Sequence, residues 1–321
     1  MILVCGGLAD RVTELVCARL DACRYPYRLL DFGLYPAGYE VAWTWEGGCP
    51  SGTIAGPEWS LALEELSGVY ARYLGPEGRV ALPGITDDLA PALFAEYDAA
   101  FGLLLEDMPC LVVNKLGPGL SNHSKPYQAL RLRECGIRTP DTLVTTDAAA
   151  ARAFYEEHDG AVIYKSLSGV RSIVRRLGPA QLERLPLLAH GPAQFQAFVP
   201  GDNVRVHTVG DELFATRVRS EAVDYRYAKR EGAEMEMEAF ELPATVAESC
   251  LHASRALGLP LAGIDFKLTP DGEYVCFEVN PSPGFLFYEQ YTGQPISEAL
   301  ANLLRAGRSS AFPQPQEYVN G

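Results

Sequence analysis

The sequence lacks the patterns that mark several classes of protein. Its eight cysteines form no CxxC pair and stand in no Cys/His cluster at zinc spacing, which disfavours a structural zinc site. The five histidines are scattered and none lies in a nucleophile motif, so covalent hydrolase chemistry is disfavoured. No stretch reaches the roughly 18 uncharged apolar residues of a membrane helix, and residues 1–7 carry no cationic signal-peptide segment. We therefore expect a cytoplasmic protein without a membrane partner, since free cysteines suit a reducing compartment.

The composition is that of an ordinary folded protein. Of the 321 residues, 48% are hydrophobic and 21% are charged, and the length suits two domains or one large one. Acidic residues outnumber basic ones by 41 to 27, and the net charge of −14 disfavours nucleic acid as a partner. Eleven of the 27 cations nevertheless lie between residues 165 and 230. That concentration indicates either a site for an anion or a solvated basic face.

The N-terminal third has the pattern of an α/β domain. Ile2–Cys5 is expected to form a strand, Asp10–Cys23 an amphipathic helix and Tyr27–Phe32 the next strand. The glycines at positions 6 and 7 do not complete a GxGxxG pattern and are interpreted as turn residues. A turn-rich stretch over residues 112–124 marks the first domain boundary. Further elements expected here are strands at Val41–Trp45 and Gly68–Tyr73 and a helix at Asp87–Leu105.

The rest of the chain first continues as a small α/β module and then becomes α+β. A helix is expected from Lys125 to Cys135, ended by Gly136, and Thr146 is the expected N-cap of an Ala-rich helix. From Gln194 onward consecutive antiparallel strands dominate. The expected elements are strands at Ala161–Lys165, Phe195–Val199, Val204–Val209 and Leu213–Ser220, a hairpin at Ala262–Asn280, and helices at Pro179–Arg184, Ala244–Leu257 and Ser297–Arg305.

The strongest local signal is a hairpin that carries two carboxylates and an amide. Strand alternation places Asp265 on one face of the first strand and Glu278 and Asn280, with Cys276, on one face of the second. With a four-residue turn, Asp265 is expected to lie across from Cys276. Carboxylate and amide oxygens are ligands that suit Mg²⁺ bridged to phosphates. The alternative is a solvent-facing polar side of the hairpin.

Several cations stand where an anion could be bound. Lys165 ends an apolar strand and opens a loop that contains Ser168 and Gly169, as a phosphate-covering loop would. The loop has a single glycine, so by pattern alone an ordinary surface turn is favoured. Arg217 and Arg219 lie two apart on a strand and point the same way. With Arg226 they could clamp a carboxylate or phosphate, or they are surface cations on a strand edge.

Taken in order, these segments resemble the ATP-grasp superfamily, in particular the RimK-type glutamate ligases and the microviridin-type (graspetide) peptide ligases. The resemblance rests on Gly263-Ile264-Asp265 followed by Phe277-Glu278-Val279-Asn280-Pro281, and on the segments around Lys125, Lys165 and Arg205. It implies an N-terminal α/β pre-ATP-grasp domain over residues 1–113. Two α+β lobes that clasp ATP would follow, a central one over 114–197 and a C-terminal one with the metal site over 198–321.

The resemblance also implies residue roles. Lys125 and Lys165 would contact the nucleotide phosphates beneath the loop with Ser168 and Gly169. The segment Gln194, Phe195, Gln196, Ala197 and Phe198 would form the hinge beside adenine. Asp202 or Asn203 would lie on the ribose side, near Arg205. Asp265, Glu278 and Asn280 would hold magnesium, as two ions, and Arg217, Arg219 or Arg226 would steady an acyl phosphate.

The implied reaction is an ATP-dependent union of a carboxylate with an amine on an amino-acid or peptide substrate. It would pass through an acyl phosphate and release ADP and phosphate, and it needs no side-chain nucleophile, only positioning and charge neutralisation. One alternative is a peptide macrocyclase that forms side-chain ester or amide links. Another is a regulator that binds ATP without catalysis. The sequence leaves the assembly of a homo-oligomer open.

Overall fold

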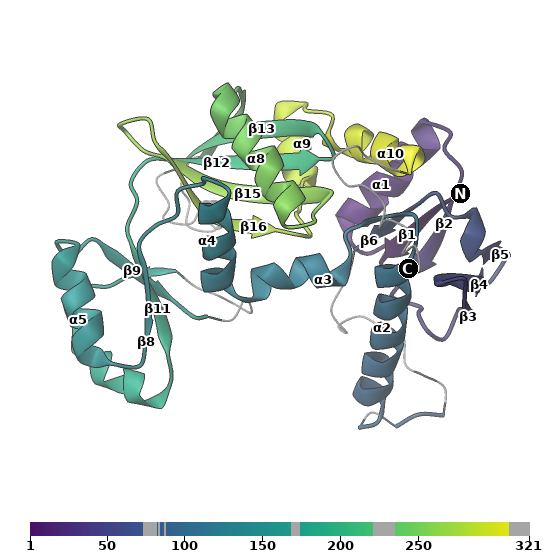
Figure 1. Cartoon of the computed structure of the whole chain (residues 1–321), viewed down its shortest axis with the longest axis horizontal. Coiled ribbons are helices and arrows are strands. Elements are labelled where there is room, and N and C mark those ends of the chain that lie inside the picture. The colour runs from purple at the N-terminus through teal and green to yellow at the C-terminus, as the bar shows by residue number, and fades with distance from the viewer. Residues whose placement is uncertain (73–81, 83, 87, 168–173, 221–234, 308–321) are drawn as a thin grey trace, which may run out of the picture.

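A computed structural model of the chain describes residues 1–72, 82, 84–86, 88–167, 174–220 and 235–307. It contains four sheets, which form three regions along the molecule (Figure 1). A parallel sheet and a small antiparallel sheet lie in the N-terminal region, and a second antiparallel sheet lies at the opposite end. The largest sheet lies between them. This arrangement agrees with the α/β and α+β content expected from the sequence.

The N-terminal region is built on a parallel sheet of order β2-β1-β6-β7. The central strand β1 (Ile2–Gly6) is buried on both faces, as parallel strands usually are. Helix α1 (Arg11–Ala22) covers one face and begins where the Asp10 side chain accepts a hydrogen bond from the Thr13 N–H. Helix α2 (Ala90–Asp107) covers the other. The remaining strands are β2 (Tyr27–Asp31), β6 (Gly68–Ala71) and β7 (Leu111–Val113).

A three-stranded antiparallel sheet, of which the sequence indicated only the first strand, packs beside α2. Its strands are β3 (Glu40–Glu46), β4 (Cys49–Gly56) and β5 (Trp59–Ala62). Glycines and a proline interrupt the apolar pattern of β4, which explains why it was missed.

The middle part of the sequence forms the antiparallel sheet at the end of the molecule opposite the N-terminal region, with strand order β10-β9-β11-β8 and helix α5 (Ala148–Glu157) packed on it. We call it the central sheet for its place in the sequence. The N-cap of α5 is Asp147, whose side chain accepts from the Ala149 N–H, and not Thr146 as expected. Asp caps as readily as Thr, so the pattern alone did not choose between neighbours. The strands are β8 (Thr142–Thr145), β9 (Val162–Lys165), β10 (Arg175–Arg176) and β11 (Ala193–Ala197), with short helix α6 at Pro179–Leu182.

The C-terminal region is a five-stranded antiparallel sheet of order β14-β13-β12-β15-β16. One face packs against helix α8 (Ala244–Ala256) and against α4 (Lys125–Glu134), which the sequence had placed in the central lobe. The strands are β12 (Asp202–Val209), β13 (Glu212–Ser220), β14 (Met235–Phe240), β15 (Leu261–Leu268) and β16 (Tyr274–Asn280).

The last helix ties this sheet to the N-terminal region. Helix α10 (Ile296–Ala306) buries Leu300 and Leu304 in one core with Ile2, Val4 and residues of α1. Helix α9 (Leu286–Thr292) lies between the two regions and contributes to the same core. A shared core resists hinge motion, so the N-terminal sheet is held in place relative to the C-terminal sheet. The short helices α3 (Leu116–Gly119) and η2 (Leu120–His123) connect the regions on the other side (Figure 1).

Candidate nucleotide and metal site

Two carboxylates and an amide converge on one face of the C-terminal sheet, where β15 and β16 pair. Asp265 lies directly opposite Glu278, and Gly263 opposite Asn280. The Asn280 Nδ2 donates to Asp265 Oδ2 at 3.0 Å and lies 3.3 Å from Glu278 Oε1. We call Asp265, Glu278 and Asn280 the carboxylate–amide cluster.

The expected pairing of Asp265 with Cys276 is wrong. The hairpin closes one residue later than expected, with Leu268 opposite Tyr274, so Cys276 pairs with Phe266; a β-bulge between Asp265 and Phe266 then brings Glu278 opposite Asp265. Cys276 is fully buried in the core under α8 rather than on the polar face. An extra residue in one strand reverses the alternation beyond it, and simple counting along the sequence does not see it.

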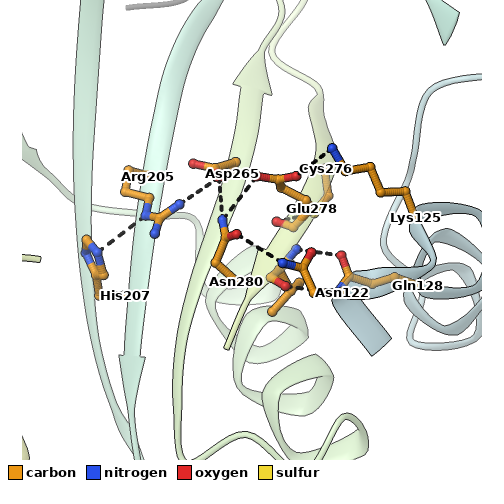
Figure 2. Close-up of polar contacts among 10 residues, drawn as sticks. Asn122, Lys125, Gln128, Arg205, His207, Asp265, Cys276, Glu278 and Asn280 are labelled. Carbon is orange, nitrogen blue, oxygen red and sulfur yellow. Dashed lines mark hydrogen bonds and ion pairs between the residues drawn. The ribbon is translucent and has the colours of Figure 1, made fainter. Parts of the chain in front are cut away.

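Three positively polarised groups surround the two carboxylates. Arg205 Nη1 lies 2.6 Å from Asp265 Oδ2, and Lys125 Nζ lies 3.5 Å from Glu278 Oε2 (Figure 2). The Asn280 amide nitrogen is the third. The Arg205 side chain is only 8% exposed, so its pair with Asp265 is weakly screened by solvent. Each of the two carboxylates therefore contacts at least one positively charged side chain, and both lie within reach of the Asn280 amide.

A buried histidine supports Arg205 from behind. The Arg205 Nε donates to His207 Nε2 at 3.3 Å. His207 is fully buried beside Phe285 and Tyr288. Burial first, and then the charge of Arg205, lowers the pKa of His207 well below its usual value. The neutral ring thus keeps an acceptor on Nε2, and its Nδ1 has no hydrogen-bond partner within the described part of the chain.

Two amides on the segment before and within α4 reach β16, and the sequence analysis missed both. The Asn122 Nδ2 donates to Asn280 Oδ1 at 3.4 Å. The buried Gln128 makes two bonds of 2.8 Å to the backbone of Val279. Asn122, Lys125 and Gln128 follow one another at intervals of three, which places them on one side of a helical segment. That spacing around Lys125 was the available signal.

The loop after Asn280 is held by the N-terminal region. Arg72 Nη1 donates to Ser282 Oγ at 3.1 Å and approaches the Pro283 carbonyl at 3.4 Å. The guanidinium also binds both oxygens of Asp10. Burial alone would raise the pKa of Asp10, but hydrogen bonds from Arg72 and Thr13 leave it below its usual value. Asn114 adds a hydrogen bond to the Pro281 carbonyl.

The predicted nucleotide-binding segment of the central sheet divides between two faces. Gln194 pairs with Lys165, and Gln194, Gln196 and Lys165 are all buried. Phe195 points the other way into the core under α5, so its side chain does not face the two glutamines. The Oε1 atoms of Gln194 and Gln196 are buried and have no partner among the described residues, which suits an incoming donor such as a base amino group. The Arg176 Cζ atom lies 3.7 Å from the centre of the Phe198 ring, and Ala197 pairs with Val162.

Comparison with protein families identifies the fold. The RimK-like ATP-grasp domain matches residues 127–304, more than half of the chain. The chain belongs to the RimK-like ATP-grasp family. The family and the ATP-grasp fold expected from the sequence are thus confirmed.

Among curated relatives of this ATP-grasp chain is a probable alpha-L-glutamate ligase of Rhodopirellula baltica. It is 32% identical over 198 residues, which are 59% of this chain and 48% of that protein. The chain therefore spans about half the length of the curated relative that it matches.

Two solved structures are similar over almost the whole chain. The ATP-grasp ligase PsnB, complexed with a phosphomimetic variant of its minimal precursor, Mg and ADP, is 28% identical with a TM-score of 0.79. The match covers 95% of this chain and 98% of PsnB. The macrocyclase MdnC of Microcystis aeruginosa MRC, bound with precursor peptide MdnA, is 23% identical with a TM-score of 0.80 and covers 95% and 99%. At that identity the MdnC match shows the fold alone.

The carboxylate–amide cluster of this ATP-grasp chain fits a magnesium ion in its donor set. All of its oxygens are hard donors, and Arg205 and Lys125 supply positive charge beside the carboxylates, while the Asn280 amide donates a hydrogen bond. No group of three or more His, Cys, Asp or Glu side chains that could hold a metal occurs within the described ranges. Two carboxylates and one amide leave room for water and phosphate oxygens, which is how Mg²⁺ is usually bound at nucleotide sites.

Two of the three predicted catalytic arginines lie elsewhere. Arg217 pairs with Val204, whose side chain belongs to the core under α8, whereas Arg205 and Asp265 face the opposite side of the sheet. Arg217 binds Asp202 at 2.5 Å, and Arg219 lies 3.6 Å from it. The spacing of two residues placed both arginines on one face but did not say which face. Their expected acyl-phosphate role has no support from this placement.

The other predicted residues either lie outside the described part of the chain or contact different partners. Arg226, Ser168 and Gly169 lie outside the described residues. Asp202, expected on the ribose side, accepts a hydrogen bond from Arg217, and its neighbour Asn203 pairs with Lys267.

None of the helices in the described ranges combines the length and apolar character that crossing a membrane would require.

Proposed function

We propose that the protein is an ATP-dependent ligase that joins a carboxylate to an amine on an amino-acid or peptide substrate. The observation that carries this proposal is the carboxylate–amide cluster with Arg205 and Lys125 at hydrogen-bond or ion-pair distance. It lies on the five-stranded sheet of an ATP-grasp fold. Of the site residues expected from the sequence, Lys125, Arg205, Asp265, Glu278 and Asn280 contact one another in this group, and we propose them as the site.

The residues have separable roles in binding. Lys125 and Lys165 neutralise phosphate charge, and the unpartnered Oε1 atoms of Gln194 and Gln196 accept from the base. Asp265, Glu278 and Asn280 would hold magnesium, as one or two ions, which supplies charge neutralisation of the phosphates. To Arg205, which binds Asp265, we assign the stabilisation of the acyl phosphate that the sequence analysis gave to Arg217, Arg219 or Arg226.

The proposed reaction has two displacements. A substrate carboxylate oxygen attacks the γ-phosphorus of ATP, the bond to the bridging oxygen breaks, and ADP leaves. The amine nitrogen then attacks the acyl carbon, loses a proton to water or a nearby base, and expels phosphate. The side chains act by positioning and by stabilising charge, so no side-chain nucleophile is used.

A peptide is the favoured substrate class, with formation of a side-chain ester or amide ring as the second candidate function. Support comes from the similarity to PsnB, a ligase bound to its precursor, which extends over 95% of this chain including the N-terminal region. The glutamate ligase relative covers only 59%. The intact carboxylate–amide cluster disfavours a regulator that binds ATP without turnover, because binding alone needs fewer metal ligands.

The testing experiment incubates the purified protein with ATP, Mg²⁺ and pools of amino acids and of Glu- or Asp-containing peptides. We expect ADP and phosphate to form only with a productive substrate, together with a product lighter by one water than its combined reactants. Loss of one water from a single peptide would identify ring formation. ADP release that no pool stimulates, or formation of AMP, would contradict the proposal. The Glu278→Gln variant serves as the inactive control.

A further inference from the structure

The amide of Asn280 is turned with its nitrogen toward the two carboxylates. Its Nδ2 donates to Asp265 Oδ2 at 3.0 Å and to Glu278 Oε1 at 3.3 Å, and its Oδ1 accepts from Asn122 Nδ2 at 3.4 Å (Figure 2). An amide binds a cation through its oxygen, because the NH₂ group is a donor only. In the orientation seen here, the oxygen of Asn280 faces Asn122 and not the carboxylates.

To present its oxygen to a cation, Asn280 has to turn its amide over about the Cβ–Cγ bond. This terminal torsion is broad and roughly twofold, so the turn needs no movement of β16. The turned Nδ2 then faces Asn122, whose own Nδ2 points back at it. Two N–H donors that face each other cannot hydrogen-bond, so the contact between the two amides is lost.

Asn122 holds the atom that resolves this conflict. Its Oδ1 is buried and finds no hydrogen-bond partner among the described residues. If the Asn122 amide turns over as well, this oxygen accepts the bond that Asn280 Nδ2 now donates. The pair keeps its hydrogen bond in both arrangements, with the direction of donation reversed.

We propose that Asn122 is a positioning residue that works with Asn280 as a coupled amide pair. In one arrangement Asn280 donates hydrogen bonds to Asp265 and Glu278, and in the other its oxygen would be available to the cation. The inference rests on the proposed magnesium site. It adds to that site a residue from the η2 turn, outside the sheet that carries the carboxylate–amide cluster.

The segment that carries Asn122 is held at a fixed distance from β16. Gln128 binds the Val279 backbone with two bonds of 2.8 Å and so sets the distance between this helical segment and β16. Lys125, between Asn122 and Gln128, reaches Glu278 at 3.5 Å. With the backbone held on both sides, only the two amide groups have to turn.

The experiment measures cation binding rather than turnover. Mn²⁺ is titrated into the full-length protein saturated with ADP, and free Mn²⁺ is followed by electron paramagnetic resonance. We expect Asn122→Leu, which has a similar shape but no polar atom, to weaken Mn²⁺ binding about tenfold, as losing a group that orients a metal ligand usually does. Asn122→Asp retains an acceptor oxygen and should bind Mn²⁺ at least as tightly as the wild type. ADP affinity in EDTA should be unchanged in both variants.

Ser121→Ala is the matched control, because Ser121 Oγ is also buried and forms no hydrogen bond with Asn280 or any other described residue. It should bind Mn²⁺ like the wild type. Wild-type affinity in Asn122→Leu, or equal weakening in Asn122→Leu and Asn122→Asp, would overturn the inference. A wild-type protein that binds no Mn²⁺ with ADP, or a Glu278→Gln variant that binds it normally, would instead contradict the magnesium site itself. Thermal unfolding of each variant verifies folding, and if Asn122→Leu does not fold, Asn122→Ala, which also has no polar side-chain atom, takes its place with the same expectation.

Discussion

The two faces of the C-terminal sheet carry the same kinds of residue in different surroundings. On one face, Arg205 binds Asp265 with exposed side-chain fractions of 8% and 26%. On the other, Arg217 binds Asp202 with fractions of 26% and 32%, and Arg219 reaches Glu238 with 45% and 52%. The first pair lies within reach of a second carboxylate, an amide and a lysine. The side chains of the second group are more exposed to solvent than those of the first.

The comparison shows that the presence of arginine–carboxylate pairs does not by itself distinguish a binding site from an ordinary protein surface. Exposed ion pairs contribute about 0–1 kcal/mol and are screened by salt. A shielded group of like charges instead requires counter-charges or a cation, and it is retained where it binds something. We therefore expect substitutions on the Asp265 face to change turnover and matched ones on the Asp202 face to leave it nearly unchanged.

The largest effect is expected from Glu278→Gln. The change deletes one negative charge at similar volume, so turnover should fall about 1,000-fold, which corresponds to about 4 kcal/mol of barrier. The rate of ADP release measures it, and the midpoint of thermal unfolding should not fall. Glu238→Gln on the opposite face is the matched control and should retain its rate. Equal rates in the two variants would contradict the assignment of the carboxylate–amide cluster.

The next effect separates the two arginines. Arg205→Ala should lower kcat about 100-fold, as removal of one stabilising donor does in other active sites. Arg217→Ala should change kcat less than about threefold, because Arg217 binds Asp202 on the face of the sheet that does not carry Asp265. Steady-state kinetics with saturating ATP measures both. If Arg217→Ala is the more damaging variant, the sequence-based assignment of Arg217 is right and the face argument is wrong.

A smaller effect is expected at the central sheet. Lys165→Ala should raise the ATP concentration needed for half-maximal rate about tenfold, since one charge-assisted contact to phosphate is lost. Because Lys165 is buried, Lys165→Met is the companion variant that keeps most of the packing. ATP titration of the rate checks both variants. An unchanged requirement for ATP would remove Lys165 from the phosphate site.

The smallest effect concerns acid stability. The pKa of folded His207 lies well below the ordinary value of 6.5, so below pH 6.5 the unfolded chain binds a proton that the folded chain does not. The free energy of unfolding should therefore fall with decreasing pH, by at most about 1.4 kcal/mol per pH unit from this group. When the free energy of unfolding is measured with urea between pH 7 and pH 5, it should fall less steeply with decreasing pH in His207→Phe than in the wild type. Identical slopes would show that His207 can be protonated in the folded state.

Much of the fold was accessible from the sequence because its signals are local. The expected strand at Ile2–Cys5 and helix at Lys125–Cys135 lie within a residue or two of β1 and α4. Strand β4 was missed because glycines break its alternation. The bulge at Asp265 was missed for a different reason, since an extra residue becomes visible only when the partner strand is aligned.

The sequence by itself determined the family, the residue types of the candidate site and the approximate place of most helices and strands. These depend on the order of motifs and on periodicity, which are properties of neighbouring residues. Only the tertiary structure decided that Arg205 and not Arg217 faces Asp265, that His207 is buried behind Arg205, and that Asn122 meets Asn280. Each of these depends on strand register or on contact between distant segments, and neither is encoded in the spacing along one strand.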